Sequence, residues 1–364
     1  MLHRPDLGFH DEGQDLAGAA FYADALLPVG KARVLPPLAY RSIRFSLLED
    51  ETIWTRDWVC VGCSDEIANE GDVLPYTVGN HGIHVQRVDG ALKGRFNKAQ
   101  HGGCRAIPLQ CQTGKKTKCS FTSCGYSRDR GVIPASEMGQ ATPEMEQYLG
   151  LRPERLLPVH VMSFGPLMFV NLDVEPPPIN GALDAVVDAG QFFRDVTHRA
   201  DVGWLEFNAN WKLLGQHLAA GEPIGKPDSG DWLLSSNSIA GEPAVVAWLF
   251  PNLVLMRARG ETCVVVMQPT ALGQTLCRGA VYGALRDDAA EFWRAEIEWR
   301  AAKAVDEHLA TVRWGTGLRP ETVGAALPLQ LDAQGYWMQR MVAGRAARAM
   351  EQPSPKPIYQ HLRG

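Results

Sequence analysis

Four of the eight cysteines, Cys104, Cys111, Cys119 and Cys124, lie within 21 residues of one another. The N-terminus has no cationic segment leading into a long apolar stretch, so we expect a cytoplasmic protein whose thiols stay reduced. An isolated cysteine cluster in such a chain is typical of a metal or cofactor site rather than of a disulfide framework. His101 adds an imidazole, and the chemistry to expect there is metal binding.

The overall composition sets limits on the partners. With 364 residues, 45% apolar and 21% charged, the chain is long enough for two packed domains. The formal charge of −5 is small for this length and no long basic run occurs. These features predict no nucleic-acid partner and no electrostatic attachment to a membrane, and no window approaches the length of an apolar membrane span.

Short β segments lie on both sides of the cysteine cluster. VLPYTVG, HGIHVQRVDG and ALKGRFNK alternate apolar and polar residues and break at Gly or Asp-Gly. Strand-like segments return at 158–161 and 165–172. This pattern predicts a small antiparallel β domain over residues 39–175, with a helix near 45–58. Residues 1–38, rich in Gly, Asp, Ala and Pro, are expected to wrap the surface as an N-terminal segment.

The Pro-rich stretch PPPI at 176–179 predicts a domain boundary. After it, AVVAWLF, LVLMRARG, TCVVVMQPT and CRGAVYGAL predict a meander of antiparallel strands, followed by helices near 287–311 and 336–350. The predicted fold class is α+β. A β-rich domain lies beside a second domain, residues 176–364, in which a curved antiparallel sheet packs against a long helix.

Taken in order, these segments resemble the α subunits of Rieske non-haem iron oxygenases, the aromatic ring-hydroxylating family. The stretch from LEDETIWTRDW to GRFN resembles that family's first helix and Rieske strands, and LLPVHVMSFGPLMFVNLD resembles the last strands of the same domain. NANWKL at 208–213 resembles the start of the catalytic helix, and FPNLVLM and VVVMQPT resemble strands of the catalytic sheet. The resemblance covers about residues 40–320. It implies a Rieske-like ISP domain beside a helix-grip (START/Bet v1-like) catalytic-type domain.

The resemblance implies two iron centres, of which the first is a [2Fe–2S] cluster held by two thiolates and two imidazoles. The family presents these ligands as C-x-H on one loop and C-x-x-H on a second. Here His101 stands at the first histidine, but Ala99 stands at the preceding thiolate. Cys119 matches the second thiolate, whereas Cys124 stands where the second imidazole belongs. We therefore expect no ordinary Rieske cluster.

Three interpretations of the cysteine cluster are open. His101, Cys104, Cys119 and Cys124 form a Cys3His set that suits tetrahedral zinc, which would hold the tip of the β domain together. The same residues also suit a leftover histidine among packed free thiols, because free cysteine packs as a small apolar residue. The third interpretation is an iron–sulfur cluster with different ligands.

The second centre implied by the resemblance is a mononuclear iron held by two histidines and one carboxylate. Counting from Asn210, Pro223 falls on the first iron histidine and Ala220 on the acidic residue that bridges the metal centres of neighbouring subunits. The second histidine position lies near Asp228. The carboxylate position lies near Asp306, which alone keeps a ligand type, so we expect no mononuclear iron.

A substitute triad of His217, Glu222 and Asp306 has side-chain types that bind iron. Pro223 and Pro227 argue against it, because they break the helix where the ligand geometry must be fixed. We expect these polar side chains to face solvent or a partner.

Incomplete ligand sets on a family fold indicate a non-catalytic, stabilising α-like subunit of a hetero-oligomeric oxygenase that hydroxylates an aromatic or polycyclic substrate. Its expected partners are a catalytic α-subunit paralogue in a trimer-based assembly and, indirectly, a reductase or ferredoxin. Two alternatives stay open. One is an active oxygenase with unconventional metal ligands, and the other is a small-molecule binding module that uses the helix-grip pocket.

Overall fold

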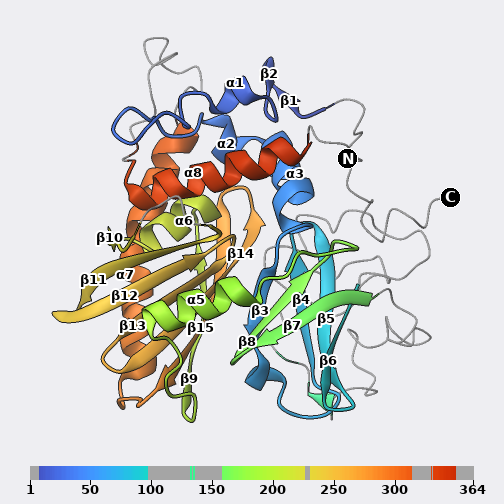
Figure 1. The fold of residues 1–364 in the computed structure, drawn as a ribbon, viewed down its shortest axis with the longest axis vertical. Coiled ribbons are helices and arrows are strands. Elements are labelled where there is room, and N and C mark those ends of the chain that lie inside the picture. Colours follow the sequence, from blue (N-terminus) through green and yellow to red (C-terminus); the bar gives the residue numbers. More distant parts are fainter. Residues whose placement is uncertain are drawn as a thin grey trace. The chain divides into compact units, whose positions relative to one another are not determined.

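The computed structural model describes residues 8–96, 132, 134–135, 158–225, 230–313, 329 and 331–349. They divide into two compact units (Figure 1). The β unit contains the described residues between Trp54 and Pro177, and the mixed unit contains those up to Ile53 and those from Pro178 onward. The sequence places the start of the β domain at residue 39, whereas residues 39–53 belong to the mixed unit, where Glu49 forms an ion pair with Lys212.

The β unit is built on a six-stranded antiparallel sheet in the order β3-β8-β7-β6-β5-β4. Asp89 and Gly90 connect β5 to β6, both with positive φ, as a tight two-residue hairpin requires. The bounds of the strands are β3 (Val59–Cys63), β4 (Val73–Val78), β5 (His81–Val88), β6 (Ala91–Phe96), β7 (Pro158–Phe164) and β8 (Leu167–Asn171).

His84 lies fully buried in β5. Burial, with a smaller contribution from the charge of Arg95, lowers the pKa of His84 to about 3. In an unfolded chain a histidine titrates at about 6.5. Between about pH 6.5 and pH 3 the unfolded state binds a proton at His84 that the folded state does not bind. The contribution of His84 to the free energy of unfolding is therefore complete above about pH 6.5 and is lost as the pH falls towards 3.

We therefore expect a His84→Gln substitution to flatten the pH dependence of unfolding between about pH 6.5 and 3, by up to ~1.4 kcal/mol per pH unit. Urea unfolding of both proteins at a series of pH values measures the two slopes. Equal slopes in this range would show that burial does not keep His84 neutral.

The mixed unit contains a seven-stranded antiparallel sheet in the order β10-β11-β12-β13-β14-β15-β9. Strands β11 to β15 follow one another as a meander, and β9 pairs with β15 at the far edge (Figure 1). The strands expected after the proline stretch are confirmed. Their bounds are β9 (Arg199–Phe207), β10 (Glu222–Pro223), β11 (Trp232–Ile239), β12 (Glu242–Leu249), β13 (Leu253–Ala258), β14 (Glu261–Ala271) and β15 (Gln274–Gly283).

Three helices, α6 (Trp211–Leu218), α7 (Ala289–Arg313) and α8 (Ala333–Ala346), pack on one face of this sheet. Trp337 of α8 contacts Trp248 of β12, and the indole of Trp293 in α7 donates to Glu261 of β14 at 2.8 Å. Trp248 and Glu261 share a face, because register and alternation place both on the same side. Although α7 has 25 residues, no helix in the described part is long and apolar enough to cross a membrane.

The described part of the N-terminal segment does more than wrap the surface. Leu16, Tyr22 and Leu35 are buried, and Gln339 of α8 donates to the carbonyl of Ala25 at 2.6 Å. The prediction from composition missed these contacts because single apolar residues among Gly, Asp and Pro have no periodicity. The segment contains β1 (His10–Asp11), β2 (Gln14–Asp15) and α1 (Ala19–Tyr22), and leads to α2 (Leu38–Arg41) and α3 (Ile43–Glu49).

The helix expected near residues 45–58 is shorter than predicted. It consists of α3 followed by a π-helical turn over Asp50–Trp54. Ser42 begins α3, since its hydroxyl accepts a hydrogen bond from the backbone N–H of Phe45 at 3.2 Å. One further helix, α5 (Asn180–Gly190), contacts β11 and β12.

Candidate functional site

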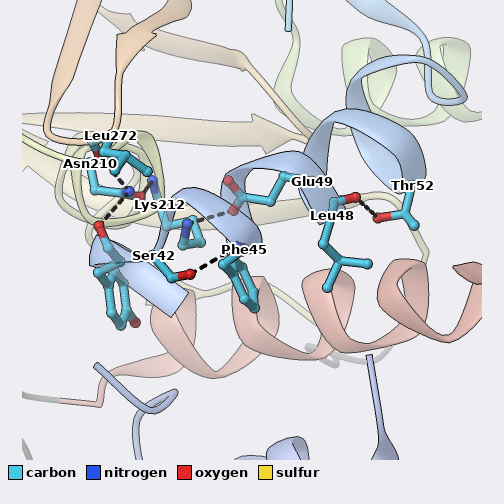
Figure 2. A network of polar contacts seen from close by, with 9 residues as sticks. Ser42, Phe45, Leu48, Glu49, Thr52, Asn210, Lys212 and Leu272 are labelled. Atoms are coloured by element: carbon cyan, nitrogen blue, oxygen red, sulfur yellow. Dashed lines mark hydrogen bonds and ion pairs between the residues drawn. The ribbon is translucent and has the colours of Figure 1, made fainter. Parts of the chain in front are cut away.

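Helix α6 begins at a side-chain cap. Asn210 accepts a hydrogen bond from the backbone N–H of Lys212 at 3.1 Å, which satisfies a donor that the first helical turn leaves open. The Asn210 amide group also donates to the carbonyls of Leu272 at 2.8 Å and Tyr40 at 3.4 Å (Figure 2). The helix start expected at NANWKL is confirmed, and the cap ties it to α2 and to the β14–β15 turn.

A buried ion pair joins α6 to α3. Lys212 Nζ lies 2.5 Å from Glu49 Oε1, and both side chains are almost completely buried (Figure 2). The ammonium group also lies 5.2–5.3 Å from the ring centroids of Tyr40, Phe45 and Trp211, within cation–π range. Burial lowers the pKa of Lys212 and raises that of Glu49, and the opposite charge of each partner counteracts these shifts.

Helix α6 ends at Leu218, well before the positions that the resemblance assigns to iron. Ala219 caps the helix, and Glu222 and Pro223 then pair as β10 with β11. Ala220 lies in the connection, half-buried, and Pro223 lies within a strand. Both positions therefore lie beyond the helix, and neither offers a side-chain ligand.

The substitute triad is not assembled. Glu222 and Asp306 are exposed, whereas His217 is buried and pairs through Nε2 with Glu307 Oε2 at 2.8 Å. The sequence interpretation missed Glu307, although the spacing of the inward-facing residues on α7 contains the signal. Trp293, Ile297, Ala301, Ala304 and His308 are buried at helical spacing, which places residue 306 on the opposite side.

His308 lies one residue beyond Glu307 and is also buried. It packs against the β14–β15 turn so closely that a Cβ added at Gly273 would lie 2.2 Å from its Nε2 atom. Burial, together with the nearby charge of Lys212, lowers the pKa of His308. This histidine is therefore a neutral, packed side chain.

The described residues do not fit a mononuclear iron. Ala220 and Pro223 have no metal-binding atom, and Asp306 is exposed. Over residues 8–96, 158–225, 230–313 and 331–349, no group of three or more His, Cys, Asp or Glu side chains is placed to hold a metal. The remaining predicted position, Asp228, lies outside the described residues.

The proposed cluster residues His101, Cys104, Cys119 and Cys124 also lie outside the described residues, so their fit rests on side-chain types alone. Ala99 offers no thiolate to a Rieske cluster. The cysteines that the structure describes are all buried on strands and form no disulfide; they are Cys60, Cys63, Cys263 and Cys277. Burial raises the pKa of Cys60, Cys263 and Cys277.

No protein-family model matches the chain. Among curated proteins, it is 29% identical over 183 residues to the glycine betaine monooxygenase oxygenase subunit of Chromohalobacter salexigens, covering 50% of this chain and 40% of that protein. It is 24% identical over 199 residues to the biphenyl 2,3-dioxygenase α subunit of Rhodococcus jostii, covering 51% and 41%. The match therefore spans less than half the length of these relatives.

Solved structures extend the likeness to the fold. The apo form of the quaternary ammonium Rieske monooxygenase CntA matches with a TM-score of 0.57 at 16% identity, over 86% of this chain and 95% of that one. A naphthalene 1,2-dioxygenase matches with a TM-score of 0.55 at 15% identity, over 91% and 95%. The chain is a homologue of the α subunits of Rieske-type oxygenases and has their fold.

Proposed function

We propose that this chain is a non-catalytic α-like subunit that stabilises a hetero-oligomeric Rieske-type oxygenase. One observation carries the proposal: the segment after α6 forms strand β10 where the family's iron ligands would lie. Pro223 replaces a ligand histidine within that strand, and Asp306 is exposed. Neither side chain can serve an iron in this arrangement.

The cofactor content follows from these positions. We propose that the chain holds no mononuclear iron and no Rieske cluster, because ligand types are missing at Ala99 and Pro223 and the bridging acidic residue is replaced by Ala220. Zinc is the metal that the Cys3His set of His101, Cys104, Cys119 and Cys124 would take, with a structural role. The sheet with α6 and α7 on one face also supports the helix-grip description of the mixed unit.

The proposed partner is a catalytic α-subunit paralogue. The resemblance implies trimers in which electrons pass from one subunit's cluster to the next subunit's iron. A chain without these ligands would interrupt that transfer, so it belongs at defined positions that leave catalytic neighbours intact. A reductase or ferredoxin would reach the assembly through the catalytic partner, whose substrate we propose to be an aromatic or quaternary ammonium compound, as the relatives' names suggest.

Co-expression with a catalytic α paralogue tests this function. We expect a tag on this chain to retain the paralogue in a complex of defined mass, and the complex to keep oxygenase activity longer on warming than the paralogue alone. An α subunit from an unrelated oxygenase, expressed in the same way, is the control. A stable monomer that retains neither protein would contradict the proposal.

A further inference from the structure

We infer that side chains of α7, α8 and β11 have closed the position at which the family holds its mononuclear iron, so that protein groups connect α6 to α7 in place of a metal. The inference deepens the proposed function and rests on it for the loss of iron chemistry. Beyond the loss of iron, the position of the family's mononuclear iron is filled by protein groups rather than vacant.

The first connection is the pair of His217 and Glu307. His217 lies in the last turn of α6, and its Nε2 is 2.8 Å from Glu307 Oε2 on α7, although the two residues are 90 positions apart in the chain. Both side chains are largely buried, so water has little access to this hydrogen bond. The other carboxylate oxygen of Glu307 lies 4.0 Å from Lys303 Nζ. This pair holds the end of α6 against α7.

Arg300 forms the second connection. Its Nη1 donates to the carbonyls of Leu218 at 3.1 Å and Ala220 at 3.2 Å, and its Nε donates to Glu296 at 2.7 Å. The last carbonyls of a helix have no partner within the helix, and here a buried cation supplies one. Arg300 therefore stabilises the C-terminal end of α6 at Leu218.

Two amide side chains hold the connection to β10. Asn237 of β11 donates to the carbonyl of Ala220 at 2.5 Å, and Gln334 of α8 donates to the carbonyl of Gly221 at 2.7 Å. Gly221 lies so close to β11 that an added Cβ would be 2.5 Å from the carbonyl oxygen of Ser236. The backbone on both sides of Ala220 is thus fixed by partners from separate elements.

The surrounding interior is filled by side chains. An added Cβ at Gly335 of α8 would lie 2.9 Å from the Gln216 side chain, and one at Gly215 would lie 2.3 Å from the Trp248 ring. Helices α6 and α8 therefore lie in direct contact with their neighbours. Moving residues 220–223 to meet a ligand on α7 would break several buried hydrogen bonds together, each costly because it leaves a buried polar group unpaired.

It follows that restoring the ligand types does not restore the iron site. We expect the triple variant Ala220→Asp, Pro223→His, Asp228→His, purified alone after growth with iron, to contain no more iron per chain than the wild-type protein. About one additional iron atom per chain would overturn the inference while leaving the proposed function intact. Iron at that level in the wild-type protein would contradict both.

Arg300→Met tests the closed position without relying on the triple variant to fold. We expect it to lower the thermal midpoint by about 5 °C or more, since two carbonyls lose a charged donor. Arg286→Met is the matched control, because Arg286 pairs with Glu242 at 3.2 Å while both side chains are about half exposed, and it should shift the midpoint by about 1 °C or less. Equal shifts in the two variants would overturn the inference.

Discussion

Replacing Lys212 by methionine is expected to lower the free energy of unfolding by about 3–5 kcal/mol. The substitution keeps the length of the side chain but leaves the Glu49 carboxylate buried and without its cation. A hydrogen bond from the Trp211 side chain still favours the charged form of Glu49, but the larger contribution, the charge of Lys212, is lost. The ion pair joins α3 to α6, so its loss weakens the contact between the chain's N-terminal part and the rest of the mixed unit.

Urea unfolding followed by tryptophan fluorescence measures this effect. Lys93→Met is the control, since Lys93 forms an exposed pair with Asp89 at 3.2 Å and should contribute less than about 1 kcal/mol. The double variant Lys212→Met, Glu49→Met should recover much of the loss, because no buried charge is left without a partner. If Lys212→Met were as mild as Lys93→Met, the buried pair would not hold α6 in place.

Trp248→Ala is expected to destabilise the protein by a similar amount, about 3–5 kcal/mol. Trp248 is fully buried, its ring centroid lies 5.1 Å from that of Trp337, and its indole donates to the carbonyl of Pro251 at 3.2 Å. It also fills the space next to Gly215. Removing the ring leaves a cavity between the sheet and two helices that cannot collapse without moving α6.

Trp299→Ala is the matched control for this prediction, because the same side chain is removed from α7 at a position that is 73% exposed. We expect its free energy of unfolding to stay within about 0.5 kcal/mol of the wild-type value. Thermal and urea unfolding of the two variants give the comparison. A loss at Trp299 equal to that at Trp248 would mean that α7 is packed on its outer side as well.

Local signals predicted much of the fold. The runs of apolar residues located β4 to β8 and β12 to β15, but not β9, β10 and β11, and Asp89-Gly90 marked a hairpin turn. The start of α6 was expected from the family resemblance of NANWKL. The prolines at 176–178 lie next to the division between the two units at Pro177–Pro178. The strands, the hairpin turn and the proline stretch depend on residues close together in sequence, where local patterns carry the information.

Contacts between distant residues were beyond the reach of such signals. Glu49 and Lys212 are 163 positions apart, and His217 and Glu307 are 90 apart, so no local pattern joins them. The choice between Asp306 and Glu307 depends on a single step around α7, which decides whether a carboxylate faces solvent or the interior. An alignment of family positions does not fix that rotation.

The proposed loss of iron ligands goes together with buried hydrogen bonds at the end of α6. In the mixed unit Arg300 donates to the carbonyl of Leu218 at the end of α6. Asn237 and Gln334, from two other elements, donate to the carbonyls of Ala220 and Gly221 just beyond it. The arrangement supports a subunit that keeps the oxygenase fold for assembly.

The iron content of the full-length chain, purified alone after expression with abundant iron and sulfur, tests the proposed loss of both iron centres most directly. Elemental analysis, read together with the visible absorption spectrum, gives the number of iron atoms per chain. The proposed function predicts iron far below one atom per chain and no Rieske absorption, with any bound metal being zinc. About three iron atoms per chain, together with Rieske absorption, would contradict it.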